Sequence, residues 1–353
     1  MRSESAAPTL DERQPARLVP RPLPKLLSIV IPMFNEEDVF PLLRERLSKL
    51  KSTWGCAVEI LLVDDCSRDR TPALSMDWAQ ADRDIKVIRL SRNFGHQIAT
   101  TAGLHFARGD AVVMLDADLQ DPPELIGQML RDYCDGYDVV YGQRIDREGE
   151  TAFKLLTARF FYLLMRRLVV RNLPENTGDF RLMSRRVVDH LKRLREHDRF
   201  LRGLVTWMGY EQKALPYHRD ARGAGQTKYT LLKMIHLATN AILSFSDLPL
   251  RMIIWLGMLT VGVSAALIVF VLYKYVTDPA RFVPGYASLA IMISFFSGMI
   301  LTALGMLGLY VGRIYTEVLS RPLFLVAETA NLGAEPASVA AEPPPDAESV
   351  LRP

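Results

Sequence analysis

Residues 111–123 read AVVMLDADLQDPP, a short apolar run that ends in closely spaced aspartates. An apolar run of this length with β-branched valines predicts a strand that is buried on both faces. Asp116 and Asp118 follow the run directly and are separated only by Ala117. Ligands of open parallel sheets bind beyond the carboxyl ends of the strands. The stretch therefore predicts an acidic site at one edge of an α/β sheet.

Similar apolar runs alternate with helical patterns through residues 26–145. Strands are predicted at 26–31 (LLSIVI), 59–63 (EILLV), 86–90, 111–115 and 138–141 (DVVY), with helices after Asn35 and after Thr71. This alternation predicts the α/β class, with a mostly parallel sheet covered by helices on both faces. Polar residues follow other strand ends too, as in Asp64-Asp65 and in Gly142-Gln143-Arg144. Because these ends share one edge, we expect the side chains to converge there.

The two aspartates and a neighbouring amide oxygen have the chemistry of a divalent cation site. Asp116, Asp118 and Gln120 offer the hard oxygen ligands that Mg²⁺ or Mn²⁺ prefers. Crowded carboxylates repel one another, so a cation is expected among them. Water and substrate phosphate oxygens would complete the coordination, and the ion would neutralise a diphosphate leaving group. The alternative is that an aspartate in this position only caps the next helix.

Composition excludes several classes of protein. The chain has 353 residues, of which 49% are hydrophobic, and this excludes a wholly disordered protein. Its net charge of +3 gives no electrostatic argument for a nucleic-acid partner. The three cysteines form no CxxC or Cys/His cluster, so neither a disulfide framework nor a structural zinc site is expected. Reduced thiols in a cytosolic compartment are the simpler interpretation.

Both ends of the chain are expected to lack fixed structure. Residues 1–25 are rich in proline and charge, without the apolar core of a secretory signal, and predict a disordered arm. Residues 314–353 are expected to form a largely disordered cytoplasmic tail, because an Ala/Pro/Glu tract begins near Glu328.

Two uncharged stretches, residues 252–273 and 282–312, precede this tail. Each is long enough to cross a membrane, which takes about 20 apolar residues. They predict two transmembrane helices within residues 251–313, the alternative being buried core helices. Arg251 precedes the first stretch, and Arg313 and Arg321 follow the second. The positive-inside rule therefore predicts a multi-pass protein of the inner (cytoplasmic) membrane, with residues 26–228 as a domain facing the cytoplasm.

The segment before the first span and the glycines of the spans leave alternatives open. Residues 229–250 predict an amphipathic juxtamembrane helix, which lies in the membrane interface or packs on the soluble domain. Small residues let helices approach closely, either within one chain or in a homo-oligomer. The glycines concerned are Gly257, Gly262, Gly298, Gly305, Gly308 and Gly312.

Several motifs occur in a fixed order along the chain. They are IPMFNEE (31–37), LLVDDCSRDRT (61–71), RNFGHQIATTAGLHFARGD (92–110), LDADLQDPPE (115–124) and TGDFRLM (177–183). This set resembles glycosyltransferase family two in its polyprenyl-phosphate branch, which includes bactoprenol glucosyltransferases and dolichyl-phosphate mannose synthases. The resemblance covers about residues 26–250 and the paired spans. It implies a GT-A type fold that binds a nucleotide sugar.

The resemblance also implies roles for residues at matching positions. The nucleotide-sugar site would comprise Pro32, Phe34, Glu36, Val63, Asp65, Asp116, Ala117, Asp118, Gln120 and Arg144. In this site Asp65 would accept a hydrogen bond from the ribose or base, and Arg144 would meet phosphate oxygens. Arg222 and Lys228, in RGAGQTKYT, match a basic loop that would hold the acceptor phosphate, the donor diphosphate or both.

Asp118 and Asp179 are the implied catalytic residues, and the role of Asp179 stays open. In this family an acidic residue at its position lies by the acceptor, as a general base or an orienting group. An acceptor phosphate is already ionised near neutral pH, however, so Asp179 has as strong a case as a structural partner of Arg181.

The reaction implied is the inverting, metal-dependent transfer of a single hexose to a polyprenyl phosphate, with release of a nucleoside diphosphate. No Trp follows an Arg, so the Gln-x-x-Arg-Trp signature of processive synthases is absent from the sequence. UDP-glucose is the preferred donor, because TGDFRLM and RFLRGLVTWMGY look closest to the bactoprenol glucosyltransferases. The alternatives are GDP-mannose, a modified UDP-pentose, and a membrane scaffold that binds nucleotide without turnover.

Overall fold

The computed structural model describes residues 18–145, 177–194, 196–197, 199–218 and 285–332, with isolated positions between 253 and 277. The chain divides into two compact units. Unit 1 comprises residues 1–156, 172–228 and 322–353, and unit 2 comprises residues 157–171 and 229–321. The predicted juxtamembrane helix of residues 229–250 lies outside the described residues.

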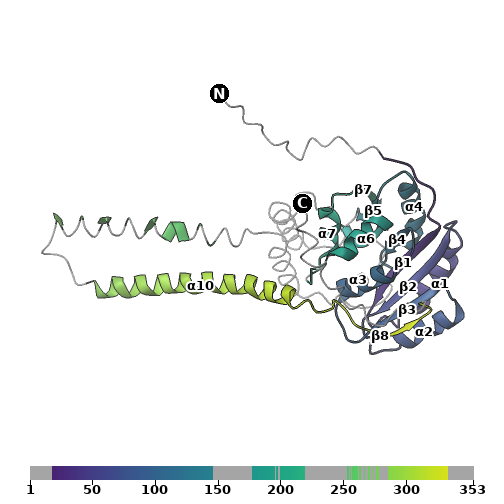
Figure 1. Ribbon diagram of the computed structural model, residues 1–353, viewed down its shortest axis with the longest axis horizontal. Coiled ribbons are helices and arrows are strands. Elements are labelled where there is room, and N and C mark those ends of the chain that lie inside the picture. Colours follow the sequence, from purple (N-terminus) through teal and green to yellow (C-terminus); the bar gives the residue numbers. More distant parts are fainter. Residues whose placement is uncertain are drawn as a thin grey trace, which may run out of the picture. The chain divides into compact units, whose positions relative to one another are not determined.

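Unit 1 is built on an eight-stranded sheet with the order β7-β5-β6-β4-β1-β2-β3-β8 (Figure 1). The strands are β1 (Leu26–Met33), β2 (Ala57–Asp64), β3 (Ile85–Leu90), β4 (Ala111–Met114), β5 (Val139–Arg144), β6 (Thr177–Ser184), β7 (Gln212–Tyr217) and β8 (Val326–Ala330). Strands β3, β2, β1 and β4 run parallel to one another, and β5 runs parallel to β7. The predicted α/β class and mostly parallel sheet are confirmed, with a strand at each predicted run.

The structure adds a strand that the sequence does not predict, and this strand reaches the acidic edge. β6 lies between β4 and β5 and is antiparallel to both. Every residue of β6 is buried, although the segment TGDFRLMS contains Asp179 and Arg181. A charged, non-alternating segment carries no local strand signal, because its burial depends on partners from elsewhere in the chain.

Helices cover both faces of the sheet (Figure 1). They are α1 (Phe40–Lys51), α2 (Thr71–Ala81), α3 (His96–Phe106), the 3₁₀ turn η2 (Pro123–Leu125), α4 (Ile126–Cys134), α6 (Arg185–Arg193) and α7 (Leu201–Trp207). Gly103 fixes the approach of α3 to the sheet. A Cβ at this position would overlap Val30 and lie 2.9 Å from Cγ2 of Val63. The close approach sets the place of the first residue of α3, His96, at the carboxyl edge of the sheet.

Two segments expected to be disordered contain ordered residues. Within the expected arm of residues 1–25, the Arg21 guanidinium pairs with Asp138 at 3.3 Å and lies over the Tyr133 ring. In the expected tail, β8 pairs with β3, and Asn331 Nδ2 donates to the carbonyls of Ala79 and Ile85 at 2.6 and 2.9 Å. Ordered structure therefore continues past Glu328 as far as Asn331, and residues 333–353 of the predicted tail lie outside the described residues. The exposed edge of β3 supplies the hydrogen-bond partners that local composition does not reveal.

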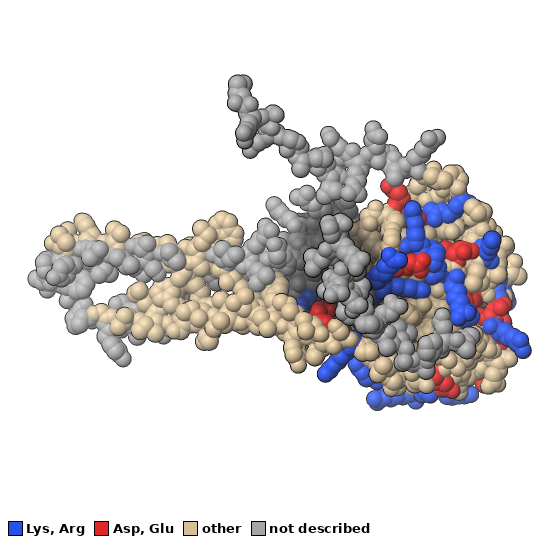
Figure 2. Space-filling view, viewed as in Figure 1, with Lys and Arg blue, Asp and Glu red and all other residues tan. Residues whose placement is uncertain are grey.

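Unit 2 contains α10 (Tyr286–Val318), and in the described part of the chain Phe295–Val318 alone is long and apolar enough to cross a membrane. Figure 2 shows the charged side chains gathered on unit 1, while the described positions of α10 carry few. Leu301, Leu304 and Val311 are exposed on α10. Thr260 Oγ1 contacts Met299 Sδ, so a position in the first predicted span adjoins α10. The second span is thus matched by a helix, and the first remains a prediction because only isolated positions of it are described.

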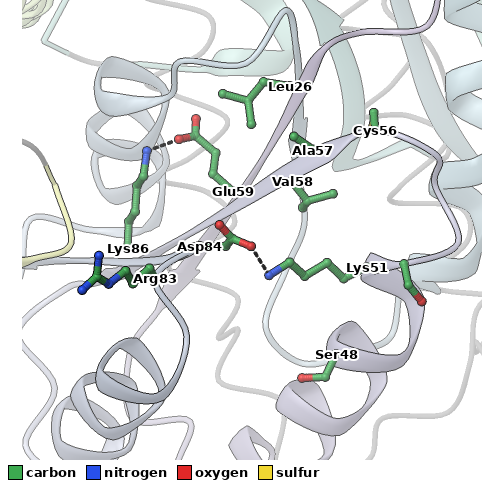
Figure 3. Close-up of a pocket in the computed structure, with 11 residues that line it drawn as sticks. Leu26, Ser48, Lys51, Cys56, Ala57, Val58, Glu59, Arg83, Asp84 and Lys86 are labelled. Atoms are coloured by element: carbon green, nitrogen blue, oxygen red, sulfur yellow. Dashed lines mark hydrogen bonds and ion pairs between the residues drawn. The ribbon is translucent and has the colours of Figure 1, made fainter.

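An open groove of about 450 Å³ lies at the amino ends of β1, β2 and β3, opposite the acidic edge (Figure 3). Lys51 pairs there with Asp84, and Lys86 pairs with the buried carboxylate of Glu59. Oε1 of Glu59 also accepts the Ser28 hydroxyl at 2.5 Å and the Arg108 N–H at 2.7 Å. Burial alone would raise the pKa of Glu59, but these contacts outweigh it and lower that pKa. In this groove, ion pairs connect the amino ends of neighbouring strands, as Lys86 of β3 does with Glu59 of β2.

We predict that Glu59→Gln lowers the free energy of unfolding by about 2–3 kcal/mol at pH 7, because charge-assisted hydrogen bonds are lost in a buried place. A depressed pKa gives stability that is present above the unfolded pKa of about 4.3 and is lost as pH falls through the folded value. The gap between variant and wild type should therefore begin to shrink below about pH 4.3 and become small once the pH lies below the folded pKa of Glu59.

Thermal unfolding of the full chain in detergent measures this gap. The matched control is Glu45→Gln, which removes an exposed pair with Lys49 and should leave the midpoint nearly unchanged. A gap that stays equal from pH 7 down to a pH below the folded pKa of Glu59 would mean that its charge contributes nothing.

Candidate active site

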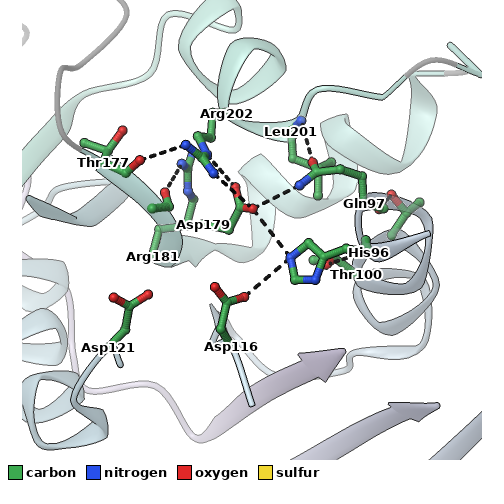
Figure 4. A network of polar contacts seen from close by, with 12 residues as sticks. His96, Gln97, Thr100, Asp116, Asp121, Thr177, Asp179, Arg181, Leu201 and Arg202 are labelled. Atoms are coloured by element: carbon green, nitrogen blue, oxygen red, sulfur yellow. Dashed lines mark hydrogen bonds and ion pairs between the residues drawn. The ribbon is translucent and has the colours of Figure 1, made fainter. Parts of the chain in front are cut away.

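The acidic edge is formed where β4 ends and β6 begins. Val113 pairs with Leu182 and Met114 with Arg181 in an antiparallel register. Continuing that register by two residues sets Asp116 opposite Asp179. Two carboxylates far apart in the sequence are thus brought together by one strand pairing, as Figure 4 shows.

The turn after β4 orients the predicted metal ligands. Ala117 is buried, whereas Asp116, Asp118 and Gln120 are partly exposed. Asp118 Oδ1 accepts the Gln120 N–H at 3.1 Å, and Leu119 adopts a left-handed conformation with φ of 56°. This alternation places both carboxylates, partly exposed, at the edge of the sheet while the alanine packs in the core.

A polar network joins this turn to three other elements (Figure 4). His96 Nε2 lies 3.4 Å from Asp116 Oδ1 and 3.5 Å from Asp179 Oδ2. Arg202 Nε lies 2.7 Å from Asp179 Oδ1, and Gln97 Nε2 donates to Asp179 Oδ2 at 3.0 Å. Asp179 is therefore held by α3 on one side and by α7 on the other.

The electrostatics of the network shift the pKa values of its two aspartates in opposite directions. Burial raises the pKa of Asp116, and the carboxylates of Asp179, Asp121 and Asp118 add to this while His96 opposes it. Burial would also raise the pKa of Asp179, but Arg202 and His96 outweigh it and hold that pKa well below its usual range. Burial lowers the pKa of His96, yet Asp179 and Asp116 raise it to about 8, so His96 is largely a cation at neutral pH.

Arg144, predicted to meet phosphate oxygens, ends β5 beside the same edge. Its Nη2 lies 3.3 Å from Asp121 Oδ1, and its Nε donates to the Tyr217 hydroxyl at 3.2 Å. Gly178 makes room for this guanidinium, because a Cβ there would lie 2.6 Å from Arg144 Nη2. The arginine is therefore held in place by an ion pair, and it remains partly exposed.

The residues predicted to hold the base and ribose follow β1 and β2. Pro32 and Val63 are register partners on these strands, and the Val63 side chain is wholly buried against α3. Phe34 is 37% exposed, while Glu36 is partly buried. The Asp65 carboxylate accepts the N–H groups of Phe94 and Gly95 at 2.7 and 2.8 Å. Asp65 thus orders the loop before α3, and the Val63 side chain belongs to the core.

Sequence reasoning missed part of the network, and Arg222 and Lys228 lie outside the described residues. The missed residues are His96, Gln97, Asp121, Arg202 and Tyr217. His96 and Gln97 follow the end of β3 within RNFGHQ, so their place after a strand was the available signal. Arg202 lies within RFLRGLVTWMGY, but its contact with Asp179, like that of Tyr217 with Asp121, depends on how α7 and β7 pack.

The side chains at this edge would supply only part of the ligands of a bound cation. Within the described ranges, no group of three or more His, Cys, Asp or Glu side chains is placed to hold a metal ion. Asp116 and Asp118 supply two carboxylates, so an ion bound there would need its remaining ligands from water and substrate. The raised pKa of Asp116 fits as well, because a dication would relieve the repulsion among the carboxylates.

Comparisons with solved structures give weak overall superpositions. The mannosyltransferase PcManGT from Pyrobaculum calidifontis, in complex with GDP-Man and Mn²⁺, aligns at 16% identity and a TM-score of 0.39, over 83% of this chain and 91% of that chain. The glucosyl-3-phosphoglycerate synthase from Mycobacterium tuberculosis, in complex with Mn²⁺, UDP and phosphoglyceric acid, aligns at 18% identity and a TM-score of 0.43, over 62% of this chain and 76% of that chain.

Comparisons of sequence extend over nearly the whole length of the relatives. The model of Glycosyl transferase family 2 matches residues 28–192. The chain is 46% identical to an uncharacterized glycosyltransferase of Synechocystis sp., over 86% of this chain and 95% of the relative. It is 36% identical to the SfII prophage-derived bactoprenol glucosyl transferase of Shigella flexneri, over 86% of this chain and 98% of that protein. With its GT-A-like α/β sheet, the chain is a glycosyltransferase and belongs to glycosyl transferase family 2.

Proposed function

We propose that the protein transfers one glucose from UDP-glucose to a polyprenyl phosphate, giving a polyprenyl-phosphate sugar and UDP. The observation that carries the proposal is the carboxylate pair Asp116 and Asp118 at the carboxyl edge of the sheet, beside the cations His96, Arg202 and Arg144. Bactoprenol glucosyl transferases that align over almost their full length support the acceptor and the sugar.

The donor diphosphate would lie between Asp116-Asp118 and Arg144. A Mg²⁺ or Mn²⁺ ion held by Asp116, Asp118 and Gln120 would supply Lewis-acid stabilisation of the leaving diphosphate. Arg144 would add a guanidinium for phosphate oxygens, at the cost of its present pair with Asp121. Phe34, which is exposed beyond β1, and Glu36 would contact the nucleoside.

The acceptor would attack the anomeric carbon through its phosphate oxygen. A phosphate with a second pKa near 6 is already ionised at neutral pH and needs no general base. Asp179, whose pKa is held low by Arg202 and His96, is a poor base in any case. We therefore assign Asp179 an orienting role. A single in-line displacement inverts the anomeric centre, and Arg222 and Lys228 would hold phosphate from the acceptor side.

The apolar helix α10 supports a membrane location. Its segment Phe295–Val318 has the length and composition of a span. A polyprenyl acceptor stays in the bilayer while a nucleotide sugar arrives from water, so the reaction needs a soluble domain joined to a membrane anchor. We propose a multi-pass protein of the inner membrane with unit 1 facing the cytoplasm.

The metal assignment predicts that Asp118→Asn abolishes transfer, because one of two anionic ligands is lost. Removing divalent ions with EDTA should abolish wild-type transfer as well, and Mn²⁺ or Mg²⁺ should restore it. The assay follows labelled sugar into lipid from UDP-glucose and a short polyprenyl phosphate. Asp77→Asn, on the exposed face of α2, is the matched control and should keep full activity. Undiminished turnover by Asp118→Asn would refute the assignment.

The donor is tested by offering purified membranes a panel of radiolabelled nucleotide sugars. UDP-glucose should label the lipid fraction. Labelling by GDP-mannose or a UDP-pentose in its place would overturn the sugar and keep the enzyme class. Labelling by none of them would favour a scaffold that binds nucleotide without turnover.

Gly178→Ala should lower kcat/KM by about 10- to 100-fold, because its Cβ would lie 2.6 Å from Arg144 Nη2 and so displace the guanidinium. The unfolding midpoint should change little, since the displaced atoms are the end of a flexible side chain. Gly127→Ala on α4 is the control, because its Cβ meets nothing closer than Trp54 at 4.0 Å. Equal activity of the two variants would show that the place of Arg144 is immaterial.

A further inference from the structure

We infer that Gln97 is a positioning residue that locks α7 onto the active site through Asp179 and Arg202. The inference rests on the proposed sugar transfer for its kinetic part only. Gln97 lies in the first turn of α3, directly after His96, and Arg202 lies in the first turn of α7. We call the three side chains of Gln97, Asp179 and Arg202 the polar clamp.

Gln97 joins three elements with one amide. Its Nε2 donates to Asp179 Oδ2 on β6 at 3.0 Å, and its Oε1 accepts the N–H of Leu201, the first residue of α7, at 3.1 Å. Phe200, which precedes α7, provides no side-chain cap for that helix. The first N–H groups of a helix need outside acceptors, and Gln97 supplies one from another helix.

Arg202 completes the clamp from the α7 side. Its Nε and Nη2 lie 2.7 and 3.4 Å from the two carboxylate oxygens of Asp179, and its Nη1 donates to the Thr177 carbonyl at 2.8 Å. A planar guanidinium bound to both oxygens fixes the orientation of the carboxylate as well as its distance. Asp179 is largely buried, so few alternative partners are available to it.

The clamp demands a side chain that both donates and accepts. Glutamate could accept the Leu201 N–H, but it would place a second carboxylate against Asp179. Methionine has a similar length and makes neither hydrogen bond. A glutamine here therefore meets a specific geometric demand. The apolar residues Leu201, Leu204 and Val205 pack α7 into the core, and the polar clamp adds directional contacts at its first turn.

The polar clamp is connected to the predicted metal site through a chain of side-chain contacts. Asp179 faces His96, which faces the predicted metal ligand Asp116. Without the Gln97 hydrogen bonds, α7 is free to move, and the Arg202 guanidinium then separates from Asp179. The positive side chains of the site no longer have a fixed position relative to the carboxylates. We expect the loss to fall on the rate of the bound complex, because the donor contacts assigned to Asp118, Arg144 and Phe34 lie elsewhere.

Gln97→Met is the principal test, with Gln128→Met on α4 as a matched control that removes side-chain hydrogen bonds to Asp132 and Arg131. Gln97→Met should lower kcat by about 10- to 100-fold while the KM for the donor changes little. Hydrogen exchange should show faster exchange of the Leu201 amide, and exchange elsewhere in the core should stay as in wild type. Gln97→Glu should keep Leu201 protected and still lose kcat.

The outcomes distinguish failure of the polar-clamp inference from failure of the proposed reaction. Full kcat in Gln97→Met would overturn the inference, and so would a lowered kcat with the Leu201 amide still protected. If Gln97→Met does not fold, Arg202→Lys is tested in its place. This variant keeps the positive charge and loses the bidentate pair with Asp179. Wild-type kcat in Arg202→Lys would also overturn the inference. If the wild type labels no lipid from any donor, the proposed function fails, whereas Leu201 exchange in Gln97→Met still tests whether the clamp holds α7.

Discussion

The antiparallel pairing of β6 with β4 is the constraint on which the active site depends. The four parallel strands bring acidic residues to one edge, but they place no carboxylate opposite Asp116. The register of β6 does so, because it sets Asp179 across from the end of β4. A slip of one residue would turn Asp179 to the other face of the sheet. Strand pairing therefore decides the spacing of the site before any ligand binds.

The pairing of β6 with β4 also determines which acidic and basic side chains face one another. Asp116, Asp118, Asp121 and Asp179 meet in a small, partly buried space, and the protein opposes them with His96, Arg144 and Arg202. Among the described residues, Asp121 pairs with Arg144 and Asp179 with Arg202, whereas Asp116 pairs with the half-exposed imidazole of His96. Asp116 therefore faces an imidazole where the other two carboxylates face a guanidinium. The proposed binding of a cation and an anionic substrate at this edge rests on the same uneven distribution of charge.

The sequence predicted what depends on local pattern. The parallel strands and the carboxylates after β4 were readable, because apolar runs and the residues that follow them are adjacent in the chain. β6, β8 and the partners of Asp179 were not readable, because each depends on a contact with a distant segment. Asp65 shows a further limit: its carboxylate after β2 was visible, but its bonds to Phe94 and Gly95 were not. The roles of Arg222 and Lys228 remain predictions.

The order of elements along the chain has a consequence for biosynthesis. β8 lies after α10 in the sequence, yet it completes the sheet of unit 1 at β3. A ribosome therefore releases the partner of β3 only after the apolar helix has been made. Until then the nascent domain carries an open strand edge, and such edges are prone to pair with other chains. Completion of the sheet of unit 1 is thereby coupled to synthesis of the apolar helix, and a nascent chain that stalls within α10 leaves its sheet one strand short.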